Sequence, residues 1–158
     1  GAFPVEVVSA MADAALGAEQ HPVARTSRYR ADREFSSPQE AIALSAMYGA
    51  NHFPEVRGLA CLTERGTTPT MMSRLSSGLP IFALSRRPDT LQRLALCRGV
   101  IPLFFDFAAF SPQDLEARTV AFLFDGGFLS RGDFILMTMG STQGEAGKTD
   151  LMKILPVK

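Results

Sequence analysis

Residues 63–68, with the sequence TERGTT, bring three hydroxyl groups, one arginine and one glycine into six positions. They lie between an apolar run and a segment with helical character. The free amide hydrogens and the positive dipole end of a helix N-terminus suit phosphate oxygens, and Gly66 lets the backbone approach a ligand closely. These residues therefore predict a phosphate cradle. The alternative is an ordinary helix cap made by Thr67 or Thr68.

A second glycine-rich segment, GSTQGEAGKT at 140–149, ends like the phosphate-binding loop of nucleotidases. That loop requires a glycine five positions before Gly147, where this chain has Thr142. The loop must also lead into a helix, whereas the following LMKILPV segment has the pattern of a strand. A P-loop nucleotidase is therefore disfavoured, although a glycine-rich turn with Lys148 can still form an anion nest.

No set of side chains forms an evident catalytic centre. His21 and His52 are expected near helix ends, and their spacing is not that of metal ligands. Asp106 and Asp133 flank expected strand ends, where turn or cap roles are the usual ones. We therefore expect no catalytic residue and no metal ligand in this chain.

The composition is that of one globular domain. The chain has 158 residues, 46% of them apolar and 20% charged, which excludes a disordered polymer. Sixteen basic and sixteen acidic residues give zero net charge, which argues against a nucleic-acid or anionic-membrane surface. Cys61 and Cys97 are interpreted as buried thiols rather than a disulfide. Without a long apolar stretch or a signal-peptide pattern, a soluble, cytoplasmic protein is expected.

The chain divides into alternating helical and apolar segments. Helical spacing predicts a first helix at 3–18, followed by a polar connector at 21–35. The segment SPQE at 37–40 has the form of a capping box and predicts a second helix to about residue 52. Beyond it, apolar runs are expected as strands and the segments between them as helices. The runs are 58–62, 80–84, 100–105 and 133–139, and the helices are about 68–76, 88–97 and 112–125.

Short apolar runs separated by helices indicate a parallel sheet that is covered on both faces. The predicted fold class is α/β, a three-layer α/β/α sandwich. Only eleven residues, 140–150, precede the last run at 151–157, too few for a crossover helix. The sheet is therefore expected to be mostly parallel and five-stranded, with an antiparallel last strand. In such sheets ligands bind at the carboxyl ends of strands, where 63–68 lies.

The order of these segments resembles the C-terminal domain of pyruvate kinase, in a bacterial subgroup whose effector loop reads Thr-Glu-x-Gly-x-Thr. Residues 1–20 resemble the helix that closes the family's catalytic barrel, which leaves 21–158 as the domain itself. Four further segments are similar in order and spacing to the domain's first helix, its effector loop and next strand, the following helix and strand, and its terminal hairpin. They are EAIALSAMYGANHF (40–53), LTERGTTPTMMSRLSSGLPIFALS (62–85), DTLQRLALCRGVIPLFFD (89–106) and GDFILMTMG…GKTDLMKILPV (132–157).

The resemblance implies the regulatory part of an enzyme. Pyruvate kinase transfers a phosphoryl group from phosphoenolpyruvate to ADP in glycolysis, and it uses Mg²⁺ and K⁺. Its catalytic and metal-binding residues lie in the barrel, of which only the final helix is matched here. The implied chain is not catalytic alone and holds no cofactor, and Mg²⁺ and K⁺ belong to the intact enzyme.

The resemblance also assigns site residues by position. One group would hold the phosphate of an allosteric effector, and a second group would close over the same effector. The first group comprises Thr63, Arg65, Gly66, Thr67 and Thr68. The second comprises Gly147, Lys148 and Thr149.

The loop differs from that of members that use fructose 1,6-bisphosphate, which often read Thr-Lys-Ser-Gly-Arg-Ser. Here Glu64 takes the lysine place, Arg65 the serine place and Thr67 the arginine place. An acidic side chain near a second phosphate is unfavourable, so the expected effector is a sugar monophosphate or AMP. Thr68→Glu is expected to abolish binding by like-charge repulsion and to leave the fold intact, because the loop is expected at the surface.

Two other functions remain open. Pyruvate kinases are tetrameric and this domain forms one of their interfaces, so a homo-oligomer through that surface is expected, with the barrel as a second partner. The chain could then be a structural tetramerisation module without a working effector pocket. The third possibility is a small phosphotransferase that uses the Gly-Lys-Thr segment.

Overall fold

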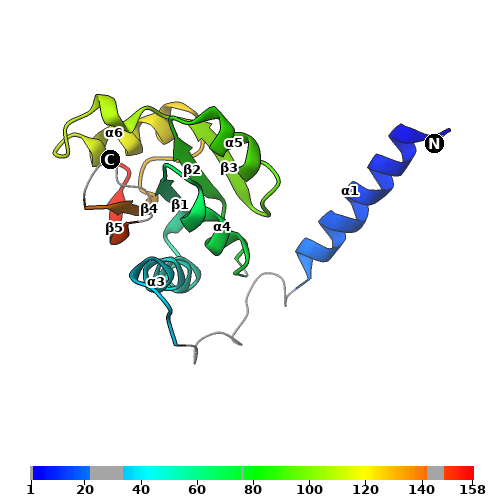
Figure 1. The fold of residues 1–158 in the computed structure, drawn as a ribbon, viewed down its shortest axis with the longest axis horizontal. Coiled ribbons are helices and arrows are strands. Elements are labelled where there is room, and N and C mark those ends of the chain that lie inside the picture. The colour runs from blue at the N-terminus through cyan, green and yellow to red at the C-terminus, as the bar shows by residue number, and fades with distance from the viewer. Residues whose placement is uncertain (1, 22–33, 76, 142–147) are drawn as a thin grey trace.

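A computed structural model describes residues 2–21, 34–75, 77–141 and 148–158, and its centre is a five-stranded sheet in the order β3-β2-β1-β4-β5 (Figure 1). Strands β1 to β4 pair in parallel, and β5 pairs antiparallel to β4. The predicted mostly parallel sheet with an antiparallel last strand is therefore confirmed. The strands are β1 (Val56–Leu62), β2 (Ile81–Ser85), β3 (Val100–Phe104), β4 (Phe134–Gly140) and β5 (Thr149–Pro156).

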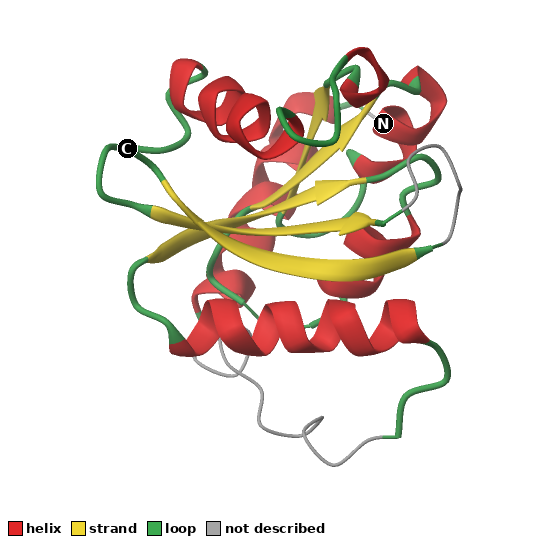
Figure 2. Ribbon diagram, turned by 90° about the vertical axis from the view of Figure 1, so that its left-hand side faces the viewer, coloured by secondary structure: helices red, strands yellow, loops and turns green. Residues whose placement is uncertain are grey.

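Helices lie on both faces of this sheet, which confirms the three predicted layers (Figure 2). On one face, α3, α4 and α5 bury Met47, Met72 and Leu94 against the strands. On the other face, α6 buries Leu115 and Leu123. The helices are α1 (Pro4–Gln20), α3 (Pro38–His52), α4 (Thr67–Ser73), α5 (Pro88–Leu94) and α6 (Leu115–Asp125), with a short 3₁₀ turn η1 (Phe107–Ala109) before α6.

The capping box predicted at the start of α3 is present. The Ser37 hydroxyl accepts the amide hydrogen of Glu40 at 3.2 Å. The Glu40 carboxylate accepts the amide hydrogen of Ser36 at 2.9 Å, one residue before the expected partner. The first of these bonds satisfies an amide that a helix start leaves without an intrahelical partner, and the two bonds together hold the first turn of α3 in place.

Helix α6 begins later than the sequence predicts. Residues 112–114 form a turn, in which the amide of Asp114 bonds to both the carbonyl and the hydroxyl of Ser111. The predicted start at residue 112 is therefore wrong by three residues, because these local bonds favour a turn before the helix.

Helix α1 confirms the predicted N-terminal helix, but none of its described residues is buried. Figure 1 shows it outside the layers of the sheet, and Glu19 near its end pairs with Arg98 at 3.7 Å. That this helix closes a catalytic barrel stays a prediction.

The expected connector falls mostly on residues 22–33, which lie outside the described residues. None of the described helices is long and apolar enough to span a membrane.

The two cysteines are free thiols, as interpreted from the sequence, and not a disulfide. Cys61 is fully buried in β1, as expected. Cys97, after α5, is only partly buried, so the expectation of a buried thiol is wrong at that position. Burial raises the pKa of the Cys61 thiol to about 12, although a hydrogen bond from Thr138 acts in the opposite direction. Cys61 is therefore a neutral, unreactive thiol.

We expect iodoacetamide at about pH 8 to modify Cys97 in the native chain and to leave Cys61 unmodified, since only the thiolate is an effective nucleophile. Peptide mass spectrometry measures the two sites separately. Both cysteines should react once urea has unfolded the chain, which is the control. Rapid native modification of Cys61 would show that β1 is not buried as described.

Candidate functional site

The candidate site lies where the strand order reverses. From β1, the chain moves through β2 to β3 on one side, and β4 lies on the other side of β1. Helices α4 and α5 cover one face of the sheet and α6 covers the opposite face. Such a switch point leaves a crevice outside the carboxyl ends of the strands. The 63–68 loop follows the carboxyl end of β1, as the sequence predicts.

The loop is shaped by its own hydrogen bonds. The Thr63 hydroxyl accepts the amide hydrogen of Gly66 at 2.9 Å. Gly66 has a φ of 76° and precedes the first residue of α4, and its carbonyl accepts both the amide and the hydroxyl of Thr70. A Cβ atom at Gly66 would lie 3.1 Å from the Leu94 side chain. The position therefore requires glycine for both its conformation and its close contact.

Thr68 forms the polar centre of the site. Its hydroxyl accepts a hydrogen bond from the Gln39 amide at 2.7 Å and bonds to the Thr149 hydroxyl at 2.8 Å. Thr68 and Thr149 are only 1% and 7% exposed. These bonds bring the first turns of α3 and α4 to the start of β5, so the structure brings two of the predicted groups together.

The expectation that Thr68 lies at the surface is wrong. Thr68 is the second residue of α4 and contacts α3 and β5 rather than solvent. A glutamate in this buried place would have to lose its hydration or its charge. Thr68→Glu would therefore disturb the fold as well as any ligand, and it cannot separate the two effects.

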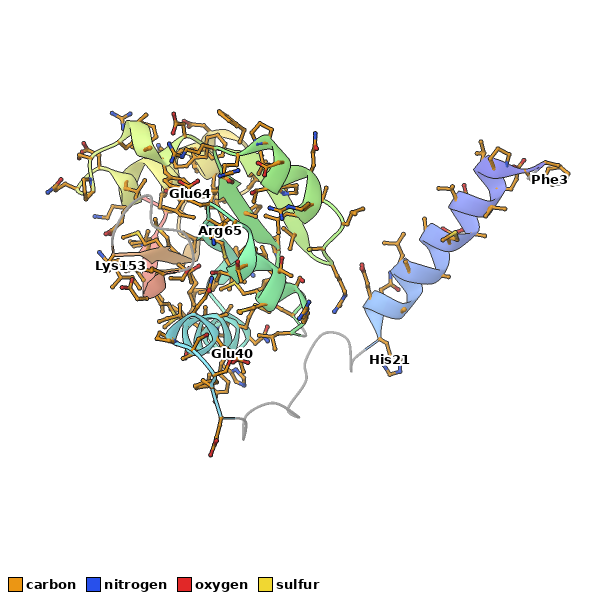
Figure 3. All side chains as sticks on the ribbon, in the orientation of Figure 1. Phe3, His21, Glu40, Glu64, Arg65 and Lys153 are labelled. Atoms are coloured by element: carbon orange, nitrogen blue, oxygen red, sulfur yellow. The ribbon has the colours of Figure 1, made fainter. Side chains whose placement is uncertain are left out.

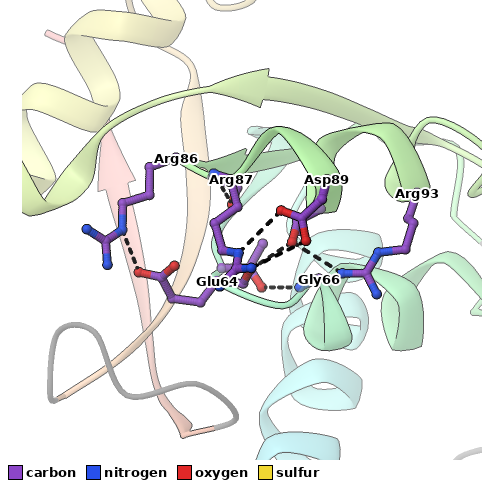
Figure 4. A network of polar contacts seen from close by, with 9 residues as sticks. Glu64, Gly66, Arg86, Arg87, Asp89 and Arg93 are labelled. Carbon is purple, nitrogen blue, oxygen red and sulfur yellow. Dashed lines mark hydrogen bonds and ion pairs between the residues drawn. The ribbon is translucent and has the colours of Figure 1, made fainter.

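Charged side chains form the rim of the site (Figure 4). The Glu64 carboxylate accepts the Arg86 Nε hydrogen at 2.9 Å, and the Glu64 carbonyl accepts the Thr90 hydroxyl at 2.9 Å. Arg87 pairs with Asp89 at 3.3 Å. This hydrogen bond holds the pKa of Asp89 below its ordinary value. Glu64 is thus oriented toward Arg86.

The remaining predicted site residues differ in their exposure to solvent, and one of them is not described by the structure. Arg65 is exposed, and Figure 3 shows it beside Glu64 on the same loop. Thr67 is half-buried as the first residue of α4. Lys148 is exposed next to Thr149. Gly147 lies outside the described residues.

The segment after the Gly-Lys-Thr sequence is strand β5, as predicted, so no helix N-terminus follows that segment. Asp150 accepts the Ser141 amide and hydroxyl hydrogens at 2.7 Å and 2.6 Å. These two bonds lower the pKa of Asp150 and join the ends of the β4–β5 connection. The geometry of a P-loop is therefore not present at this position.

Two of the four histidine and aspartate side chains named from the sequence, His52 and Asp133, have structural contacts. His52 Nδ1 donates to the Tyr48 carbonyl at 2.8 Å, within α3. Asp133 accepts the Ser130 amide hydrogen at 2.7 Å and pairs with Arg57 at 3.5 Å. In the part of the chain that the structure describes, no three His, Cys, Asp or Glu side chains lie together in a way that could hold a metal ion.

Sequence reasoning missed Gln39 and Arg86 as members of the site. Gln39 lies in the capping box, where the pattern assigns it only to a helix start. Arg86 follows β2, whose carboxyl end is adjacent to that of β1. The position of Arg86 after an apolar run was the one available signal. Nothing in the sequence indicated Gln39.

The chain matches the family model for the pyruvate kinase alpha/beta domain over residues 40–155. Over the whole of its length it is 45% identical to pyruvate kinase II of Salmonella typhimurium, of which it covers 33%. It is 44% identical, again over its whole length, to pyruvate kinase of Haemophilus influenzae, of which it covers 32%. Pyruvate kinase 2 of Synechocystis sp. is 34% identical, with 26% of that protein covered. The chain thus spans a third or less of the length of these relatives.

Gly66→Ala is expected to lower the free energy of unfolding by about 3 kcal/mol, because it combines a positive φ with a close contact to Leu94. Gly99→Ala is the matched control, since Gly99 has a φ of 69° and nothing within 4 Å of the added Cβ. The control should lose only about 1–2 kcal/mol. Urea unfolding measures both losses, and equal losses would show that the Leu94 contact does not constrain the loop.

Proposed function

The chain belongs to the pyruvate kinase family as its alpha/beta domain, and from this we propose that it is a regulatory domain that binds a phosphorylated allosteric effector. The single observation that carries the proposal is the hydroxyl cluster of the 63–68 loop and Thr149 at the switch point of the sheet. The intact protein would transfer phosphoryl from phosphoenolpyruvate to ADP, with Mg²⁺ and K⁺, and this chain would not be catalytic alone.

The chemistry of the loop supports a phosphate ligand. Thr67 and Thr68 open a helix, so their amides have no partner within it, and Arg65 is an exposed cation beside them. Lys148 adds a second cation next to the Thr149 hydroxyl. Charge-assisted hydrogen bonds from such donors are the strong ones for phosphate oxygens. The Thr63 hydroxyl is a further donor proposed for the cradle. Gly66 would contribute a close approach of the backbone, since its amide already bonds to Thr63. Gly147 stays a prediction from the resemblance.

The rim of the site supports a monophosphate rather than a bisphosphate. The Glu64 carboxylate lies next to the cradle, and it is already paired with Arg86, which follows β2. A second phosphate at this rim would meet a carboxylate and would have to displace an existing ion pair. The proposed effector is therefore a sugar monophosphate or AMP.

Calorimetric titration of the chain with glucose 6-phosphate, ribose 5-phosphate, AMP and fructose 1,6-bisphosphate tests the proposal. We expect saturable one-site binding of a monophosphate, tighter than that of the bisphosphate. A tighter fructose 1,6-bisphosphate complex would refute the role of Glu64, and no binding by any of the four would refute the effector site.

The same titration with the Arg65→Glu variant tests whether the phosphate binds at the 63–68 loop or at another surface of the chain. The change removes a charge-assisted bond and adds repulsion, so the affinity should fall by roughly a hundredfold. Arg131→Glu is the matched control, because Arg131 is exposed on the turn before β4 and carries the same charge change. Equal affinities of the two variants would show that the phosphate does not bind at this loop.

A role in assembly has its own support and is the second candidate function. Strand β5 is an edge strand, and its side chains Met152 and Ile154 are 38% and 45% exposed. Tyr48 of the neighbouring helix α3 is 63% exposed. An edge strand with exposed apolar side chains is a ready surface for pairing with a second copy about a two-fold axis. We therefore propose a homo-oligomer through this edge, with the catalytic barrel as the other partner.

Ile154→Lys is expected to shift the chain from dimer to monomer in sedimentation velocity, because a charge on the edge disfavours strand pairing. Phe104→Lys on β3 is the matched control, as β3 is the opposite edge and Phe104 is also exposed. The control should remain dimeric. A dimer that loses its stability only in the Phe104 variant would assign the interface to β3.

A further inference from the structure

We propose that Gln39 is a positioning residue for the effector phosphate, because its amide can only donate to the Thr68–Thr149 hydroxyl pair and therefore leaves one hydroxyl proton for the bound anion. The inference rests on the proposed effector site and adds to it a residue from α3. It assigns to the first turn of α3 a part in ligand binding, in addition to its part in the fold.

The three side chains come from elements that are far apart in the sequence. Gln39 is in the first turn of α3, Thr68 is in the first turn of α4, and Thr149 is the first residue of β5. The Gln39 Nε2 to Thr68 Oγ1 distance is 2.7 Å and the distance between the two hydroxyl oxygens is 2.8 Å. Both distances are those of good hydrogen bonds.

A count of protons shows how many donors this chain of bonds leaves for a ligand. Each threonine hydroxyl has one proton and can accept two hydrogen bonds, whereas the Gln39 amide nitrogen can only donate. Thr68 accepts from Gln39, and the bond between the two hydroxyls uses one of their two protons. One proton is left over, whichever hydroxyl donates within the pair. That proton is available to an acceptor outside the pair.

Because the two hydroxyls are buried, the acceptor of the remaining proton is important for the stability of the site. Thr68 and Thr149 are 1% and 7% exposed, so bulk water contributes little to their hydrogen bonding. A buried donor without an acceptor is costly, and an anion is the acceptor that gains most from it. Bonds in a row also polarise one another, so donation by Gln39 makes the last hydroxyl a better donor.

The amide of Gln39 is suited to this role and a carboxylate is not. A carboxylate at residue 39 would accept the Thr68 proton, and Thr149 would then donate its proton to Thr68. Both protons would be used inside the chain of bonds and none would remain for a phosphate. The adjacent Glu40 does not take this place, because its carboxylate accepts from Ser36 at 2.9 Å.

Two substitutions distinguish orientation from simple loss of the bond. Gln39→Glu reverses the direction of the bonds, so calorimetry with glucose 6-phosphate should show affinity reduced by roughly tenfold to a hundredfold. Gln39→Met removes the amide donor but leaves one proton free, so its loss should be about fivefold. Ser45→Glu adds the same charge on the exposed side of α3 and should stay within about twofold of the original chain.

The same variants show whether the role is only structural. Both Gln39 variants lose the hydrogen bond that the amide donates to Thr68, so a purely structural role predicts parallel losses of urea stability and of affinity, or no loss of affinity. Under the proposal, Gln39→Glu loses far more affinity than Gln39→Met at similar stability. If Gln39→Glu does not fold, unchanged affinity in Gln39→Met still overturns the proposal. If the unaltered chain binds none of the phosphorylated ligands, the proposed effector site itself is refuted. If the unaltered chain binds a ligand and the Gln39 variants bind it equally well, only the role of Gln39 is refuted.

Discussion

The buried hydroxyl of Thr68 is the point on which the arrangement of the site depends. Its two partners lie 29 and 81 residues away in the sequence. Because a buried polar group must be satisfied, the three elements that meet there cannot shift independently. The first turns of α3 and α4 and the start of β5 are therefore held together by polar contacts as well as by the apolar core. The site is built on this junction.

The loop after β1 depends on the backbone conformation of one residue and on the polar contacts of another. Gly66 supplies a backbone conformation that other residues adopt at a cost, and its position against Leu94 leaves little room for a side chain. The Glu64 carboxylate accepts from Arg86 and its carbonyl accepts from Thr90, so the loop is also connected to the segment after β2 and to α5. A ligand at the cradle would meet a preformed shape, which reduces the ordering that binding requires.

Most of the fold was predictable because it depends on local patterns. Apolar runs of strand length, separated by helices, gave the parallel sheet, and the short final connection gave the antiparallel β5. The capping box gave the start of α3. The start of α6 was misplaced because hydrogen bonds from Ser111 stabilise a turn before the helix, a competition that the residue pattern does not reveal.

The sequence by itself determined the layers, the strand directions, the loop at the carboxyl end of β1 and the family to which the chain belongs. Only the tertiary structure decided that Thr68 is buried, that Gln39 and Thr149 are its partners, and that Glu64 pairs with Arg86. The physical reason is the range of the forces involved. Periodicity and capping act within a few residues, whereas the contacts of a buried hydroxyl depend on how separate elements pack.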